Sequence, residues 1–211
     1  MDRDAIEFAA SIGGVREGSE AEREAFPGST SPIIVLENGQ RKIVASHFGL
    51  TPPWAKDADF GKKYAYNGRG ESILEKPTFR EPMLRGRRCL VRVVSFKENL
   101  GKNMWLHVFP KDPEARIYIA GLWEPANKHI ASRSHCLVTT IPNSLIGPYH
   151  DRMPVILDDA EQELWLDPST DPREAQKLIK PCQPDWLSFV EVDESAARRG
   201  RHQSHIDFDD E

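Results

Sequence analysis

Short runs of apolar residues, many of them β-branched, recur between residues 33 and 141 and are separated by Gly, Pro, Asn and Lys. This pattern is typical of β-strands bounded by turns. The runs at residues 33–36 and 43–45 flank Asn38-Gly39, a pair that favours a tight hairpin turn. Further strands of an antiparallel core are predicted at residues 89–94, 104–109, 117–122 and 136–141.

Helical signals are confined mainly to the region after these runs. Asp158 is followed three residues later by Glu161, which is the spacing of an N-terminal capping box. Pro172 opens a second helical stretch at a position where the first turn favours proline. The sequence therefore predicts helices over residues 158–166 and 171–179.

Together these patterns predict an α+β fold, in which a β-rich single domain has an antiparallel core. A chain of 211 residues can bury one sizeable core, and nothing requires a second domain. We assign residues 1–193 to this domain, with 1–24 as a divergent and partly loose N-terminal arm. Residues 194–211 carry clustered arginines followed by acidic residues, which predicts a flexible charged tail.

Charge and cysteine content limit the classes of function. The formal net charge is −5, so a nucleic-acid surface must be a local basic patch. The 3 cysteines form no closely spaced pairs, which fits a reducing compartment better than a disulfide framework. No apolar stretch approaches the roughly 20 residues of a membrane span, and the first residues lack a signal-peptide pattern. We expect a soluble, cytoplasmic monomer.

Three polar residues from distant segments are candidates for one site: Asn67, Glu98 and His150. Each ends or interrupts an apolar run, where the loops of a scaffold often present side chains to a shared cleft. Simpler roles stay open. Asn67 before a glycine fits a turn, Glu98 among lysines fits a solvated strand end, and His150 fits a structural loop cap.

Metal-dependent hydrolysis is a weaker alternative. The chain contains no His-Glu-x-x-His, no Cys-x-x-Cys and no glycine-rich phosphate loop. His202 and His205 lie in a mainly polar and charged stretch, which favours solvated side chains. We therefore expect no metal and no cofactor.

Several stretches match the motifs of one family. Residues 67–71 match Asn-Ala-Arg-x-Glu at the Asn, Arg and Glu, and residues 150–154 match His-x-Arg-Met-Pro completely. Residues 120–124 read Ala-Gly-Leu-Trp-Glu, and residues 48–54 match Trp-Gly-Leu-x-Pro-x-Trp with Phe48 replacing the first Trp. The remaining matches are Phe79-Arg80, Arg88-Cys89 and the acid Glu98, which has lost its flanking aromatic residues.

In this order the motifs resemble the SRAP family (SOS-response-associated peptidase), whose members trap abasic sites in single-stranded DNA. The resemblance implies an antiparallel, barrel-like core with peripheral helices. It also implies covalent DNA–protein crosslinking and autopeptidase activity in the DNA damage (SOS) response. It implies that Glu98 acts as acid and base, that His150 assists opening of the sugar ring, and that Asn67 orients the deoxyribose. It further implies that phosphates are bound by three arginines, Arg69, Arg80 and Arg152. Trp54 and Phe48 would stack on bases, with core packing as the alternative role for both.

The chain departs from the family at the nucleophile, which is a cysteine directly after the initiator methionine in the family and Asp2 here. A carboxylate cannot replace a thiolate as the soft nucleophile, and none of the 3 cysteines is a convincing substitute. We expect Met1 to be retained, so that its α-amine forms at most a reversible imine with an aldehyde and the autopeptidase step lacks a substrate. The sequence therefore predicts recognition of abasic single-stranded DNA with impaired crosslinking. The alternative is a non-covalent binder of single-stranded or modified DNA without catalysis.

Overall fold

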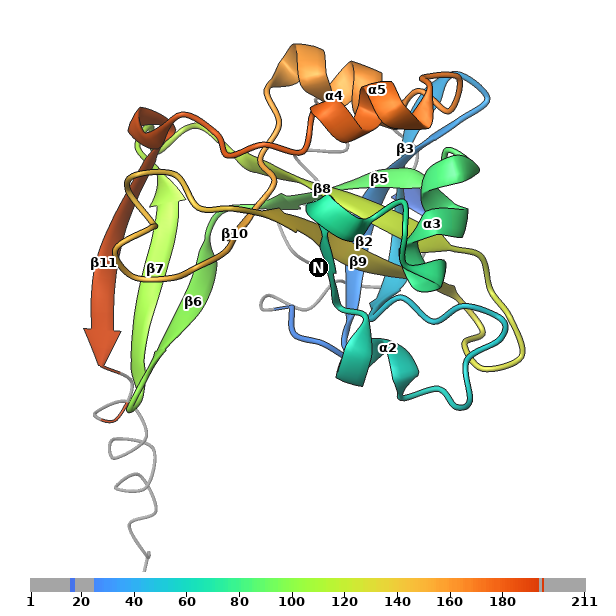
Figure 1. Ribbon diagram of the computed structural model, residues 1–211, viewed down its shortest axis with the longest axis horizontal. Coiled ribbons are helices and arrows are strands. Elements are labelled where there is room, and N and C mark those ends of the chain that lie inside the picture. The colour runs from blue at the N-terminus through green and yellow to red at the C-terminus, as the bar shows by residue number, and fades with distance from the viewer. Residues whose placement is uncertain (1–15, 18–24, 194, 196–211) are drawn as a thin grey trace, which may run out of the picture.

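The computed structural model describes residues 16–17, 25–193 and 195, and it contains two β-sheets with helices packed around the larger one (Figure 1). The eight-stranded sheet comprises β1 (Arg16–Glu17), β2 (Thr30–Glu37), β3 (Gln40–Phe48), β4 (Asn67–Arg69), β5 (Arg88–Val93), β8 (Ile117–Glu124), β9 (Arg133–Thr140) and β10 (Met153–Pro154). The three-stranded sheet comprises β6 (Phe96–Gly101), β7 (Met104–Pro110) and β11 (Leu187–Asp193). The helices are α2 (Phe60–Tyr64), α3 (Pro77–Leu84), α4 (Asp159–Leu166) and α5 (Pro172–Lys177), with short 3-10 turns η1 (Gly70–Ser72) and η2 (Pro184–Trp186).

The β2–β3 hairpin is confirmed, with Asn38-Gly39 at its turn and Glu37 paired with Gln40. Both turn residues have positive φ, 53° for Asn38 and 73° for Gly39. A two-residue turn of this kind matches the right-handed twist of the strands, and asparagine and glycine tolerate its backbone best. The strands predicted at β5, β7, β8 and β9 are also present.

The larger sheet closes on itself through β3 and β9. Strands β3, β2, β5, β8 and β9 are successive antiparallel neighbours, and β9 then pairs with β3 in parallel from Ser46↔Arg133 to Phe48↔His135. The β-rich, barrel-like core with peripheral helices is therefore confirmed. The sheet is mixed and not purely antiparallel, because β1, β4 and the closing β3–β9 contact are parallel.

The continuous apolar run of β2 reflects burial on both faces of the sheet. Ile34 packs into a cluster with α3 and α4, whereas its neighbours Ile33 and Val35 face a second cluster that includes β7. Successive strand residues point to opposite faces, so a strand covered on both sides shows no alternation of apolar and polar residues. The three-stranded sheet is thus held against the barrel by an apolar layer of its own.

Helix α4 has the predicted capping box, with Asp158 and Glu161 each accepting a backbone N–H of the other. Helix α5 begins at Pro172, with Asp171 as its N-cap, and ends at Lys177, two residues before the predicted end. The expectation that helices are confined mainly to this region is wrong, because α2 and α3 precede it. The glycine at position 61 hides helix α2 from sequence patterns. Glycine is needed there, because a Cβ atom at Gly61 would lie 2.0 Å from the backbone oxygen of Gly49. No helix in the described part of the chain is long and apolar enough to cross a membrane.

Arg88 joins the ends of α3 and α4 to the barrel. Its side chain is buried, and it donates to the carbonyls of Trp165 (2.6 Å) and Asp167 (2.6 Å) at the end of α4. Longer bonds reach Met83 in the last turn of α3 (3.5 Å) and Thr170 (3.1 Å). The last carbonyls of a helix lack partners within the helix, so one guanidinium satisfies two helix ends here.

We expect Arg88→Met to destabilise the protein by about 3 kcal/mol, because the change leaves buried carbonyls without donors. Urea unfolding measures this loss. Arg85→Met is the matched control, since Arg85 lies nearby with its side chain 63% exposed. Equal unfolding midpoints for the two variants would show that Arg88 does not support the helix ends.

Candidate functional site

Glu98 lies in the middle of β6 and not at a strand end. It pairs with Leu106 of β7, which is fully buried, and its neighbours on the same face, Phe96 and Leu100, pack against the apolar cluster. The Glu98 side chain is 20% exposed. Loss of water around the carboxyl group raises the pKa of Glu98, although the nearby imidazole of His150 opposes this shift.

His150 faces Glu98 from the loop between β9 and β10. The Nδ1 atom of His150 lies 3.7 Å from Oε2 of Glu98. The loop is held over the smaller sheet by Ile146, which is buried, and by Tyr149, whose ring contacts that of Phe189 at 4.9 Å. The structure therefore brings together two of the three predicted site residues.

The imidazole of His150 is anchored by the backbone of Arg152. Nδ1 lies 2.9 Å from the Arg152 carbonyl oxygen and 3.2 Å from the Arg152 amide nitrogen. These contacts require opposite tautomers, and the shorter one favours a proton on Nδ1 that is donated to the carbonyl. In that tautomer Nε2 carries the lone pair and is the proton acceptor of the ring.

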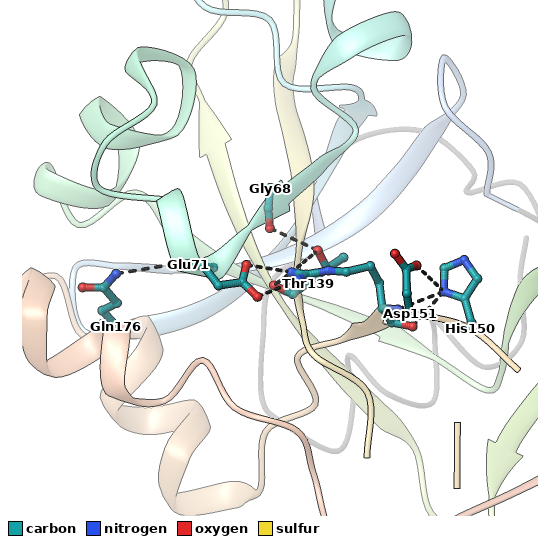
Figure 2. A network of polar contacts seen from close by, with 8 residues as sticks. Gly68, Glu71, Thr139, His150, Asp151 and Gln176 are labelled. Atoms are coloured by element: carbon teal, nitrogen blue, oxygen red, sulfur yellow. Dashed lines mark hydrogen bonds and ion pairs between the residues drawn. The ribbon is translucent and has the colours of Figure 1, made fainter. Parts of the chain in front are cut away.

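A polar network fixes the side chain of Arg152 (Figure 2). Its guanidinium donates to both carboxylate oxygens of Glu71, at 2.5 and 3.0 Å, and to the carbonyl and hydroxyl oxygens of Thr139. Thr139 in turn donates to the carbonyl of Gly68 at 3.5 Å, and Gln176 of α5 donates to Gly70 at 3.4 Å. The network thus links the two motif segments, residues 67–71 and 150–154. The sequence alone assigned no role to Glu71 or Thr139. For Glu71 a signal was present, because this residue matches the glutamate of the family motif at residues 67–71.

Asn67 is at the start of β4, which pairs in parallel with β9 at Leu137. Its side chain is exposed, and within the described residues it forms no hydrogen bond with Glu98 or His150. Thr139 of β9 pairs with Arg69 of β4 and with Pro154 of β10, so the segments of the site meet at the end of β9. The direct role of the Asn67 amide stays a prediction.

The predicted DNA-contacting arginines differ in their surroundings. Arg69 and Arg80 are exposed, and in the described part of the chain neither side chain forms a hydrogen bond or ion pair. Arg152 is 17% exposed and is held by Glu71. Of these three arginines, Arg69 and Arg80 present to solvent a guanidinium group that has no hydrogen-bond or ion-pair partner among the described residues.

The two predicted aromatic residues also differ. Trp54 is 55% exposed, and its ring makes an edge-to-face contact with that of Phe60 at 5.3 Å. Phe48 is 7% exposed and stacks on His135 at 5.1 Å. For Phe48 the structure favours core packing, which was the alternative to a stacking face, because its ring is buried.

The cysteines do not provide a replacement nucleophile. All are buried, and burial raises the pKa of Cys136 to about 12 and that of Cys182 to about 11, with that of Cys89 also raised. Among the described residues no group of three or more His, Cys, Asp and Glu side chains is arranged to hold a metal ion. Asp2, His202 and His205 lie outside the described residues.

The raised pKa of Glu98 makes stability depend on pH with a definite sign. A carboxyl group whose pKa is raised in the folded state stabilises the fold below its ordinary value, 4.5, and loses this contribution as pH rises. We therefore expect Glu98→Gln to raise the Tm relative to the parent protein at pH 7, with the difference shrinking toward pH 4.

Glu71→Gln should show the opposite sign, because hydrogen bonds from Arg152 lower the pKa of Glu71. Its loss of Tm should be present at pH 7 and should diminish in acid. Thermal unfolding of all three proteins from pH 4 to pH 7 checks both directions. A Glu98→Gln variant that is less stable than the parent protein at pH 7 would contradict the burial argument.

The family of this chain follows from its similarity to known proteins. The model of the family described as SOS response associated peptidase (SRAP) matches residues 4–198. Abasic site processing protein YoqW of Bacillus subtilis (strain 168) is 34% identical over 178 residues, covering 79% of this chain and 76% of that protein. Abasic site processing protein HMCES of Gallus gallus is 29% identical over 192 residues, covering 74% of this chain and 57% of that protein. A crystal structure of a Bacteroides thetaiotaomicron protein superposes with a TM-score of 0.78 at 28% identity, covering 92% and 90% of the two chains. The chain therefore belongs to the SOS response associated peptidase (SRAP) family.

Proposed function

We propose that this protein binds single-stranded DNA and recognises abasic or otherwise altered nucleotides in the DNA damage response. Family membership and the names of relatives as abasic site processing proteins support DNA processing of this kind. The observation that carries the proposal is the 3.7 Å contact between Glu98 and His150, which come from two separate family motifs. A general acid and a general base at such a distance suit a reaction that moves two protons.

Opening of an abasic sugar is a reaction of this type. The C1′ hydroxyl loses a proton, the bond between C1′ and the ring oxygen breaks, and the ring oxygen gains a proton. Glu98, whose pKa is raised, supplies a carboxyl group that remains protonated at higher pH than an ordinary glutamate. His150 offers the second group, and Asn67 orients the deoxyribose. The product is the open-chain aldehyde.

Binding of the DNA strand relies on a local surface, because the chain as a whole carries a formal charge of −5. Arg69 and Arg80 contact phosphates, and Trp54 provides a stacking face beside the lesion. The guanidinium of Arg152, which is bound by Glu71 and Thr139, holds its loop in place.

Position 2 favours capture without a stable crosslink. Asp2 stands where the family has its cysteine, so sulfur is not available to close a ring on the aldehyde. An amine can still add to the aldehyde carbon with loss of water and form a reversible imine. Purely non-covalent DNA binding is the second candidate function, and Asp2 supports this function as well.

We expect Arg69→Ala and Arg80→Ala each to weaken binding of single-stranded DNA and to reduce the steepness of its salt dependence by about 0.7 in log–log slope, since each change removes one phosphate contact. Fluorescence anisotropy across a salt series measures both effects. Lys128→Ala is the control, because it removes one exposed charge from the loop between β8 and β9. If all variants share one slope, these arginines do not contact phosphate.

We expect the unaltered protein to form no heat-stable crosslink with abasic single-stranded DNA, although borohydride can trap an imine. Asp2→Cys with its methionine removed should gain a stable crosslink, and Glu98→Gln or His150→Ala should slow the gained reaction. Denaturing gel electrophoresis distinguishes these products. A stable crosslink with Asp2 in place would require another nucleophile. An Asp2→Cys variant that binds DNA but stays inert would favour the non-covalent binder.

A further inference from the structure

The Glu71–Arg152 contact is more constrained than an ordinary surface ion pair. The two side chains meet in a two-pronged arrangement at 2.5 and 3.0 Å, and the Arg152 side chain is 17% exposed. The same guanidinium also donates to the Thr139 carbonyl at 2.8 Å. Planar, bidentate pairing restricts the orientation of both groups far more than a single contact with a lysine would.

Arg152 transmits this restriction to the imidazole. Its backbone carbonyl and amide are the atoms that contact Nδ1 of His150, at 2.9 and 3.2 Å. In Figure 2 Gln176 contacts the backbone next to Glu71, at Gly70, and the network continues from Glu71 and Thr139 to Asp151 and His150. A rotation of the Arg152 backbone would therefore move the carbonyl group that makes the shortest contact with Nδ1 and favours the Nδ1–H tautomer.

We propose that Glu71 is a positioning residue that, through Arg152, fixes the tautomer and orientation of His150 toward Glu98. Glu71 is half exposed and touches neither His150 nor Glu98, so it acts on the ring indirectly. The inference rests on the proposed function for its catalytic meaning, but the orientation itself is a property of the free protein. A carboxylate that orients a base in this way keeps the proton-accepting nitrogen aimed at the substrate.

A stability effect alone does not explain the arrangement. Exposed ion pairs contribute little to stability. The Glu71–Arg152 pair, together with the bond from Arg152 to Thr139, instead connects η1, β9 and the loop before β10. Its two motif segments are also the ones that carry Asn67 and His150. The same carboxylate thus relates the two halves of the candidate site.

The test is ¹⁵N NMR of the histidine rings in the free protein, with the His150 signals assigned by a His150→Gln variant. The parent protein should show separate Nδ1 and Nε2 shifts typical of one neutral tautomer. Glu71→Gln should move these two shifts toward each other, because both tautomers become populated. Glu75→Gln is the matched control, since Glu75 is an exposed glutamate four residues further along the chain.

A second comparison uses Arg152→Lys, which keeps the charge but removes the bidentate pairing. It should reproduce the shift change of Glu71→Gln, and the double variant should add nothing, because both changes break one link. Unchanged His150 shifts in Glu71→Gln, or additive effects in the double variant, would overturn the inference. The NMR result needs no DNA. Changed shifts combined with an absence of binding to abasic DNA in every variant would refute the proposed function and leave the positioning role intact.

Discussion

The pairing of β9 is the constraint on which the rest of the structure depends. Along its length this strand pairs with β8 and β10 antiparallel and with β3 and β4 in parallel. The β3 contact closes the barrel, and the β4 and β10 contacts bring in the segments that carry the candidate site. Because each pairing fixes a register, the relative positions of the two motifs follow from backbone hydrogen bonds and do not depend on the side chains of the site.

Within that frame, two acids of the site are placed in contrasting environments. Glu98 faces an apolar layer between the sheets and has a raised pKa, whereas Glu71 meets a guanidinium and has a lowered pKa. The first is suited to exchange protons and the second to remain a fixed anion. One small region therefore combines a carboxyl group for chemistry with a carboxylate for orientation, and their different solvation separates the two roles.

Local signals in the sequence were enough to predict the hairpin, most strands and the α4 cap, whereas the convergence of Glu98 with His150 was predicted from the family motifs. They failed where distant segments decide the outcome. Helix α2 depends on the approach of Gly61 to Gly49, and the parallel closure depends on strands far apart in the chain. The burial of Phe48 could not be read from its motif, because a stacking residue and a core residue have the same side chain. The partner of Arg152 was hidden for a similar reason, since a motif shows which residues recur but not which of them meet.

The parallel seam of the barrel has a consequence for folding. Ser46 and His135, whose side chains are 3.0 Å apart at this seam, are separated by 89 residues in the chain. Contacts between such distant segments form only after the entropy of closing a long loop has been overcome, so they are slow to form relative to hairpins such as β2–β3. A nascent or partly unfolded chain can form the β2–β3 hairpin before β3 pairs with β9. In such a chain β9 lacks its final register, so β4 and the His150 loop cannot take their places along its two edges. The assembled site is thus present only in molecules whose chain has folded nearly to completion.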